Sequence, residues 1–393
     1  MATKVSVGHA NAGDGAAQGK HAAEEALAGL GGQPALFGIA FATSQVELGA
    51  LAGAIKDVVG DDVPVLGCST AGEFVGDRIS AGGTALCLVA SDEMGISFAM
   101  TEGLKGNTAR SARQMARALQ TNRRPAPAGA NERTIFLLSD GMAGSGEIMV
   151  DTLAMESGAE VAIAGGAAGD DAAFKESHVF LDRVVKQDAI VAIELTSTKR
   201  IGNGVHHGWC AASDPGSVTK AEGATVIEID GKPAIEFYRA YAGQIGFDLT
   251  AENQNEFVFT NELGIVMMND ELKVRAPLGV NEDGSISCAT EIPTGQQVRI
   301  VRGDHEEIVA AAKTAAEAAV AELGGQTCAG AIVFDCVARK LVLGDTFAKE
   351  VEAFREVVGA PLAGFNTYGE IARVKGQLSG FHNTTAVVAA FPA

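Results

Sequence analysis

Short apolar runs alternate with apolar stripes of helical period along most of the chain. The first runs lie at 5–7 and 35–42, and a stripe follows at 48–58. Ser44 and Glu47, just before this stripe, have the spacing of a capping box. The pattern predicts a strand, a helix, a second strand and a second helix that begins at the capping box.

A third strand at Val63 and a pair of antiparallel strands at 84–90 and 96–100 complete this first unit. The same order of elements recurs at 101–213 and at 297–393. Strands joined through helices pair in parallel, and strands joined by tight turns pair antiparallel. We therefore expect an α/β fold of repeated strand-helix-strand-helix-strand units in mixed, largely parallel sheets.

The segment between the second and third units does not repeat this order. Residues 212–296 alternate like β-structure, with turn signals such as Asp230-Gly231, so we expect a β-rich insertion. A boundary near 214–216 divides the chain in two. The predicted parts are an N-terminal domain 1–213 with units 1–100 and 101–213, and a C-terminal domain 214–393 with a β-rich part 214–296 and an α/β unit 297–393.

A glycine-containing turn follows the third strand of each unit. It reads V-P-V-L-G-C-S-T-A-G-E-F at 63–74, A-P-L-A-G-F-N-T-Y-G-E-I at 360–371 and, more loosely, V-A-I-A-G-G-A-A-G-D-D at 161–171. Glycine permits positive φ or close approach of another chain, and a carboxylate follows in each copy. These turns are the feature around which we expect the site to form.

Composition and charge narrow the classes of partner. Hydrophobic residues make up 47% of the chain with 49 glycines, which favours close-packed α/β layers. A formal charge of -19 argues against a nucleic-acid partner. Six widely spaced cysteines are typical of reduced thiols, and no apolar run is long enough to span a membrane. We expect a cytoplasmic protein that binds neither membrane nor nucleic acid.

In open α/β sheets, small ligands bind beyond the carboxyl ends of the strands. If turns one and three face each other there, Arg339 would bind a ligand carboxylate, and acidic side chains would bind its ammonium group. Alternatively, Glu73 and Glu370 only cap backbone N–H groups, and we give both interpretations equal weight. For Asp170 and Asp171 we favour a structural role. The candidate ligand-binding residues are Cys68, Ser69, Thr70, Glu73, Asp140, Asp171, Arg339, Asn366, Thr367, Tyr368, Glu370, His382 and Asn383.

Two further types of chemistry remain open. His206 and His207 alternate across a predicted strand, so one of them faces inward, either as a haem ligand or as a hydrogen-bonded core histidine. We favour the core histidine. Cys68 lacks a histidine partner at a suggestive spacing, and Ser69 lies outside a G-x-S-x-G motif, so a nucleophilic enzyme has little support.

The chain resembles the FIST proteins, a bacterial sensory family with adjoining FIST N-terminal and C-terminal domains. The similar motifs are G-C-S-T-A-G-E-F, G-G-A-A-G-D-D-A-A-F, G-V-H-H-G-W, I-D-G-K-P-A-I-E-F-Y, F-D-C-V-A-R-K and G-F-N-T-Y-G-E-I with H-N-T-T. The resemblance implies sensing of small ligands, including amino acids, and signalling through histidine kinases or cyclic-di-GMP enzymes. It also implies that some relatives are haem-containing nitric-oxide sensors.

We therefore expect a non-enzymatic sensor that binds an amino acid or related metabolite and signals to a separate partner or to a second copy. Such a sensor needs different ligand affinities in two arrangements of its domains. The alternatives are a haem sensor of nitric oxide that uses His206 or His207, and an enzyme that uses Cys68 or paired carboxylates.

Overall fold

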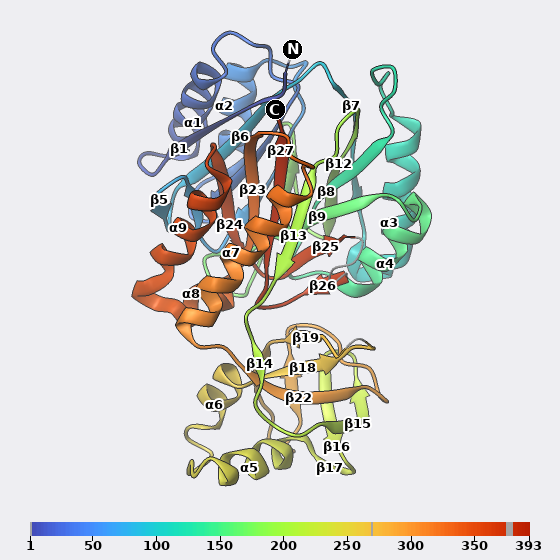
Figure 1. Ribbon diagram of the computed structural model, residues 1–393, viewed down its shortest axis with the longest axis vertical. Coiled ribbons are helices and arrows are strands. Elements are labelled where there is room, and N and C mark those ends of the chain that lie inside the picture. The colour runs from blue at the N-terminus through green and yellow to red at the C-terminus, as the bar shows by residue number, and fades with distance from the viewer. Residues whose placement is uncertain (1, 269, 375–379) are drawn as a thin grey trace.

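The computed structural model describes residues 2–268, 270–374 and 380–393. It consists of an α/β body and a smaller β-rich lobe, which lies below the body in Figure 1. The lobe comprises the elements from β14 to β22 and is inserted between β13 and α7 of the body. The predicted α/β class with a β-rich insertion is confirmed.

Unit one of the body begins at the N-terminus and ends at residue 90. Helix α2 begins later than the capping-box spacing of Ser44 predicts, because Glu47 is the N-cap and accepts from the N–H groups of Gly49 and Ala50. The elements are β1 (Lys4–Ala10), α1 (Gly15–Gly29), β2 (Phe37–Thr43), α2 (Leu48–Val59), β3 (Val65–Thr70), β4 (Glu73–Val75), β5 (Arg78–Ser80) and β6 (Thr84–Ala90).

Unit two repeats this order from residue 94 to residue 197. Its second helix starts at an ordinary N-cap, because Ser145 Oγ accepts from the Ile148 N–H. The elements are β7 (Met94–Glu102), α3 (Leu104–Thr121), β8 (Glu132–Ser139), α4 (Gly146–Ser157), β9 (Ala162–Ala167), β10 (Val179–Leu181), β11 (Val184–Lys186) and β12 (Ala189–Ser197).

Unit three has the same order, interrupted by the lobe after its first strand. A capping box of Asp304 and Glu307 opens its long helix. The elements are β13 (Gly202–His206), α7 (His305–Ala321), β23 (Cys328–Cys336), α8 (Val337–Leu343), a 3-10 turn (Gly344–Thr346), α9 (Phe347–Val358), β24 (Leu362–Thr367), β25 (Glu370–Arg373), β26 (Gly380–His382) and β27 (Ala386–Pro392).

The lobe is built on one antiparallel sheet with two short helices beside it. Its core includes Tyr238, Phe257 and Ile300, which are buried. The elements are β14 (Cys210–Ala211), β15 (Gly216–Glu222), β16 (Thr225–Ile229), β17 (Lys232–Pro233), α5 (Ala234–Gln244), α6 (Gln254–Thr260), β18 (Glu262–Val266), β19 (Leu272–Arg275), β20 (Pro277–Val280), β21 (Ile286–Cys288) and β22 (Gln297–Arg302).

The three units exchange their short hairpins around a ring. The strand orders are β1-β6-β2-β3-β10-β11, β26-β25-β9-β8-β12-β7 and β13-β27-β23-β24-β4-β5. Each sheet therefore takes four strands from its own unit and a hairpin from another unit. A single unit cannot complete its own sheet, which ties the three units into one body.

The sheets contain more antiparallel pairing than expected. Among the described strands, the parallel pairs are β2 with β3, β8 with β9, and β23 with β24. The expected pairing of 84–90 with 96–100 is wrong, because β6 pairs with β1 and β2, whereas β7 pairs with β12. The strand that ends one sheet leads directly into the first strand of the next.

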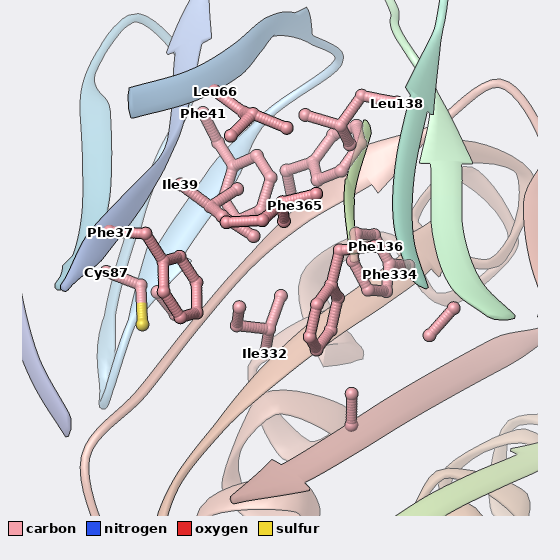
Figure 2. Packing of buried hydrophobic residues seen from close by; sticks show 14 of the residues in the cluster. Phe37, Ile39, Phe41, Leu66, Cys87, Phe136, Leu138, Ile332, Phe334 and Phe365 are labelled. Atoms are coloured by element: carbon pink, nitrogen blue, oxygen red, sulfur yellow. The ribbon is translucent and has the colours of Figure 1, made fainter. Parts of the chain in front are cut away.

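A shared aromatic core lies where the inner faces of the three sheets meet. Figure 2 shows Phe41 and Phe365 close to Phe334, with Phe136 near them. The rings of Phe41 and Phe365 stack with centroids 4.5 Å apart, and Phe334 meets Phe41 edge-on at 6.2 Å. Because all three units contribute, burial of this core stabilises the whole body.

The three glycine turns also meet, at one end of the body. The N–H of Ala71 in turn one donates to Asn366 O in turn three (3.0 Å). In the same way, turn two donates to turn one through Gly169 N, and turn three donates to turn two through Tyr368 N (3.0 Å each). This ring of hydrogen bonds confirms the expectation that turns one and three face each other.

Candidate functional site

The carboxylates of turns one and three hold their own units together. Glu73 is fully buried and accepts from the hydroxyls of Thr70 (2.8 Å) and Ser80 (2.7 Å). It also accepts from the Gly83 N–H (2.6 Å), directly before β6. Burial raises the pKa of Glu73 despite these donors. This carboxylate is a structural cap that ties turn one to the last strand of unit one.

Glu370 makes the same contacts in unit three. It accepts from the hydroxyl of Thr367, three residues earlier, and from the Thr385 N–H (3.0 Å) directly before β27. Burial raises its pKa to about 8. Turns one and three therefore share one design, in which the acid is enclosed by its own unit.

Turn two departs from this design. The threonine position is taken by Ala168, and Asp171 reaches into unit one, where its Oδ2 accepts from Thr43 Oγ1 (2.9 Å) and from the N–H and hydroxyl of Ser44 (3.0 and 2.6 Å). Asp140, at the end of β8, instead accepts from the Asp188 N–H (2.6 Å) before β12. In unit two, the N–H before the last strand is therefore bound by an acid at the end of β8 and not by the turn acid.

A cavity of 110 Å³ lies beside Asp140, between the body and the lobe. The body contributes the end of β8, the loop into α4, and the side chains of Met149, Tyr368 and Phe381, and the lobe contributes Thr290 and Glu291. A molecule in this cavity would contact both parts of the protein.

Two carboxylates give the cavity an acidic character. Asp140 accepts from Met142 N (2.9 Å) and from the Ser177 hydroxyl (2.5 Å) at Oδ1, and from Asp188 N at Oδ2. A carboxylate accepts about four hydrogen bonds, so Asp140 keeps capacity at Oδ2. Glu291 Oε2 accepts from Ser145 Oγ (3.0 Å), and none of the described residues that line the cavity is a lysine or an arginine. An ammonium group suits this lining.

Tyr368 is held in the cavity wall by turn two. Its hydroxyl donates to Asp170, and its ring stacks on Phe174 with centroids 4.5 Å apart. Burial alone would raise the pKa of Asp170, but hydrogen bonds from Tyr368 and from the N–H groups of Lys175 and Glu176 outweigh it and lower the pKa. The aromatic wall therefore depends on an ionised aspartate.

Ion pairs next to the cavity connect the lobe to the body. Glu147 in the first turn of α4 binds Lys273 and, through Oε2, Arg275 Nη2 (3.0 Å), both on β19 of the lobe. Further away, Thr384 Oγ1 donates to the buried Glu262 Oε2 (2.5 Å). A displacement of the start of α4 would therefore be transmitted directly to β19.

Arg339 lies inside unit three, away from this cavity. Its guanidinium is fully buried between Asp335 (3.1 Å) and Glu350. It also donates to the carbonyl groups of His207 and Ile308. These contacts occupy both sides of the guanidinium, so we assign Arg339 a structural role in this arrangement and no ligand contact.

The histidine pair does not fit a haem ligand. His207 Nδ1 accepts from Trp209 N (2.9 Å), so Nε2 carries the proton and donates to Leu272 O (2.9 Å). Burial lowers its pKa to about 4, so the ring is neutral with both nitrogens engaged. His206 is solvent-exposed and offers no enclosed face for a porphyrin. No described group of three or more His, Cys, Asp or Glu side chains is placed to hold a metal ion.

The other candidates lie in or near the three turns but outside the cavity. Cys68 belongs to the central core, and burial raises its pKa well above the usual value, so its thiol is protonated. Ser69 Oγ accepts from His178 N (2.9 Å). The side-chain oxygens of Asn366 and Asn383 are buried without a hydrogen-bond partner among the described residues. The Nε2 atom of His382 is buried in the same way. Asp140 and Tyr368 are thus the predicted residues that line the cavity.

Few of the other residues that line the cavity could be predicted from the sequence. Ser145 could be inferred, because it is the N-cap of a helix that begins just after a strand end. Phe381 and Glu291 come from distant segments without a motif, and Glu291 belongs to a lobe whose position relative to unit two has no local signal. Only the tertiary structure brings them beside Asp140.

The chain thus consists of three α/β units around a shared core and an inserted lobe, with an acidic cavity between unit two and the lobe. The chain belongs to the FIST family: the FIST N domain matches residues 36–232 and the FIST C domain matches residues 234–373. FIST domains are sensory signal-transduction domains. Among the described residues, no helix has the length and apolarity needed to cross a membrane.

Neither the relatives nor the solved structures assign an activity to this chain. Two uncharacterized proteins of Mycobacterium tuberculosis, from strains CDC 1551 / Oshkosh and ATCC 25618 / H37Rv, are 26% identical over 225 residues, or 55% of this chain and 57% of theirs. The match therefore spans little more than half of each relative. Two cyanuric acid hydrolase structures, one from A. caulinodans, give TM-scores of 0.32 and 0.35 at 9% and 8% identity over 99% and 100% of both chains. At such TM-scores we draw no conclusion from them.

Proposed function

We propose that the protein is a cytoplasmic, non-enzymatic sensor that binds an amino acid or a related small metabolite in the cavity between unit two and the lobe. Binding changes the position of the lobe, and a separate partner such as a histidine kinase or a cyclic-di-GMP enzyme reads that change. The observation that carries this proposal is the shared lining of the cavity, with Asp140 and Tyr368 from the body and Glu291 from the lobe.

The shared lining supplies what a sensor needs. A ligand shifts an equilibrium only as far as its affinities for the two states differ. A molecule that contacts Asp140 and Glu291 together binds more tightly when the lobe is close to α4 than when it has moved away. A ligand held entirely within the body would transmit nothing to the lobe.

The lining also suggests the ligand's chemistry. An ammonium group is attracted by the carboxylates of Asp140 and Glu291 and by the ring of Tyr368. The volume of 110 Å³ suits a small metabolite. Cys68, the thiol considered for an enzyme, lies in the central core outside this cavity, and burial raises its pKa.

Calorimetric titration of the full chain with the common amino acids tests this proposal. We expect saturable binding of at least one of them, and loss of that binding in Ala143→Leu, which fills the cavity. Ala321→Leu, which adds the same volume at an exposed position of α7, is the matched control and should bind normally. Flat titrations throughout, or equal binding by both variants, would overturn the proposal.

A further inference from the structure

The first turn of α4 leaves two backbone N–H groups without acceptors beside the cavity. The N–H groups of Ile148 and Met149 donate to Ser145 Oγ (3.3 Å) and to the Ser145 carbonyl (3.0 Å). The N–H groups of Gly146 and Glu147 have no acceptor among the described residues, and Gly146 lines the cavity. Free N–H groups at the start of a helix, together with the helix dipole, attract anions.

A hydroxyl of the lobe also lacks a partner at this cavity. Thr290 is only 6% exposed, and it lines the cavity. No described residue forms a hydrogen bond with its hydroxyl, yet the oxygen is not completely enclosed by protein atoms. Nearly buried polar groups are usually hydrogen-bonded, so this hydroxyl is available to a bound molecule. It can donate to an anion from the lobe side of the cavity.

Two cations lie behind this part of the wall. The buried Arg275 donates through Nε to the Glu291 carbonyl (3.2 Å) and contacts Glu147 Oε2 through Nη2 (3.0 Å). Lys273 contacts the same Glu147 carboxylate. Asp151, one turn further along α4, faces Lys273 but is solvent-exposed, where water and salt screen its charge. Because the two cations share one ion-paired carboxylate, their field also favours an anion at the start of α4.

The cavity therefore suits both charges of one small molecule. Asp140 and the Glu291 carboxylate attract an ammonium group, and Glu291 Oε2 lies 3.0 Å from Ser145 Oγ, next to the start of α4. In an α-amino acid, the ammonium and the carboxylate are attached to the same carbon. An ammonium group bound at Glu291 thus leaves the carboxylate within reach of α4. A simple amine would leave the free donors unused, and a simple acid would be repelled by both carboxylates.

We infer that the Gly146 N–H and the Thr290 hydroxyl form a carboxylate subsite, so that the cavity takes a free α-amino acid as a zwitterion. This inference rests on the proposed function and names the class of ligand and the groups that recognise it. One donor belongs to α4 of the body and the other to the lobe, so the ligand's carboxylate contacts both parts of the protein.

Calorimetric titration of the full chain, with each common amino acid compared with its α-carboxamide, tests the subsite. The amide keeps the ammonium group but has no carboxylate, so it carries a net positive charge. If Asp140 and Glu291 alone decided the affinity, the amide would bind at least as tightly as the free amino acid. We expect the free amino acid to bind about tenfold more tightly, because the amide loses the charge-assisted hydrogen bonds of the carboxylate.

Thr290→Val removes the hydroxyl with little change in size. It should weaken the binding of the free amino acid about tenfold and leave the binding of the amide unchanged, a difference that a merely structural role would not produce. Thr290→Ser keeps the hydroxyl and should keep the preference for the free amino acid. The matched control is Thr250→Val at an exposed position of the lobe, which should bind both ligands like the wild type.

Amides that bind as tightly as the free amino acids would overturn the carboxylate subsite and keep the sensor. Equal weakening of both ligands in Thr290→Val, or no weakening of either, would also overturn the subsite without affecting the sensor. If neither amino acids nor amides bind saturably, both proposals are wrong.

Discussion

Unit two differs from units one and three at the same point of a repeated fold. In units one and three the turn acid, Glu73 or Glu370, accepts from a threonine three residues earlier and from the N–H before the last strand. In unit two that threonine is replaced by Ala168, and the equivalent N–H is bound by Asp140. The repeat that has lost its enclosed acid is the repeat that has a cavity at its strand end.

The difference leaves one repeat with a carboxylate that its own turn does not fully use. In units one and three, the hydrogen bonds of the turn itself occupy the carboxylates of Glu73 and Glu370. In unit two, Asp171 instead accepts hydrogen bonds from unit one. Asp140 keeps one carboxylate oxygen that can accept a further hydrogen bond beside the cavity. The candidate site therefore lies at the carboxylate with remaining acceptor capacity, Asp140.

The largest expected effect is a pH dependence of stability that arises from Glu370 in unit three and Glu262 in the lobe. Burial raises the pKa of both Glu370 and Glu262 to about 8. The folded state then binds more protons than the unfolded state from about pH 4.5 to pH 8, so stability falls as pH rises through this window. We expect these two groups together to contribute a loss of about 7 kcal/mol between pH 5 and pH 8 in urea unfolding.

The double variant Glu262→Gln/Glu370→Gln is the control for this titration. It should flatten the pH dependence, because glutamine stays neutral at every pH. Asp170 of turn two, with its lowered pKa, acts with the opposite sign and stabilises the fold until the pH falls into the acid range. Parallel slopes for wild type and the double variant would show that these acids do not cause the dependence.

The second prediction compares two turn acids by isosteric replacement. Glu73→Gln can keep the contacts of Oε1, but it turns its amide N–H toward the Thr70 hydroxyl, which loses its buried acceptor, and should cost about 2 kcal/mol. Asp171 accepts all three of its described hydrogen bonds at Oδ2, so Asp171→Asn keeps them and should cost under about 0.5 kcal/mol. Chemical denaturation measures both, and equal losses would contradict the comparison.

Local pattern predicted the elements of the fold but not all of their partners. Apolar stripes of helical period predicted the helices, and short apolar runs predicted the strands. The repeated glycine motif pointed to turns that lie together at one end of the body, as the hydrogen bonds between them show. The hairpin exchange was not predictable, because nothing in the apolar alternation of β4 states that its partner is β24, nearly three hundred residues later. Pairing between units depends on packing around the shared core, which no local pattern encodes.

The site was predictable only where it lies at a strand end. Asp140 and Tyr368 follow buried strands, and they line the cavity. Arg339 has the right chemistry for a ligand carboxylate, but its carboxylate and carbonyl partners come from four separate segments and enclose it. Whether a charged side chain is free to bind depends on such contacts, which appear only in three dimensions.

The third prediction concerns the acid that replaces the enclosed glutamate in unit two. Asp140 accepts at both oxygens, so Asp140→Asn should lower the free energy of unfolding by about 1 kcal/mol. Loss of its charge should also weaken the binding of an amino acid about tenfold, measured by calorimetry. Glu160→Gln, an exposed change in the same unit, should affect neither quantity. Lost stability with unchanged affinity would leave Asp140 as a structural acid like Glu73.

The smallest expected effect concerns the aspartate that stands where the other turns have Gly72 and Gly369. Asp170 accepts from the Tyr368 hydroxyl and from the N–H groups of 174–176. Tyr368→Phe removes one of these donors and keeps the ring that stacks on Phe174, so unfolding should become easier by about 0.5 kcal/mol. Hydrogen exchange should quicken at the amides of 174–176 and stay constant in turn one. Unchanged exchange at these amides would mean that Asp170 holds the loop alone and that the aromatic wall of the cavity is independent of turn two.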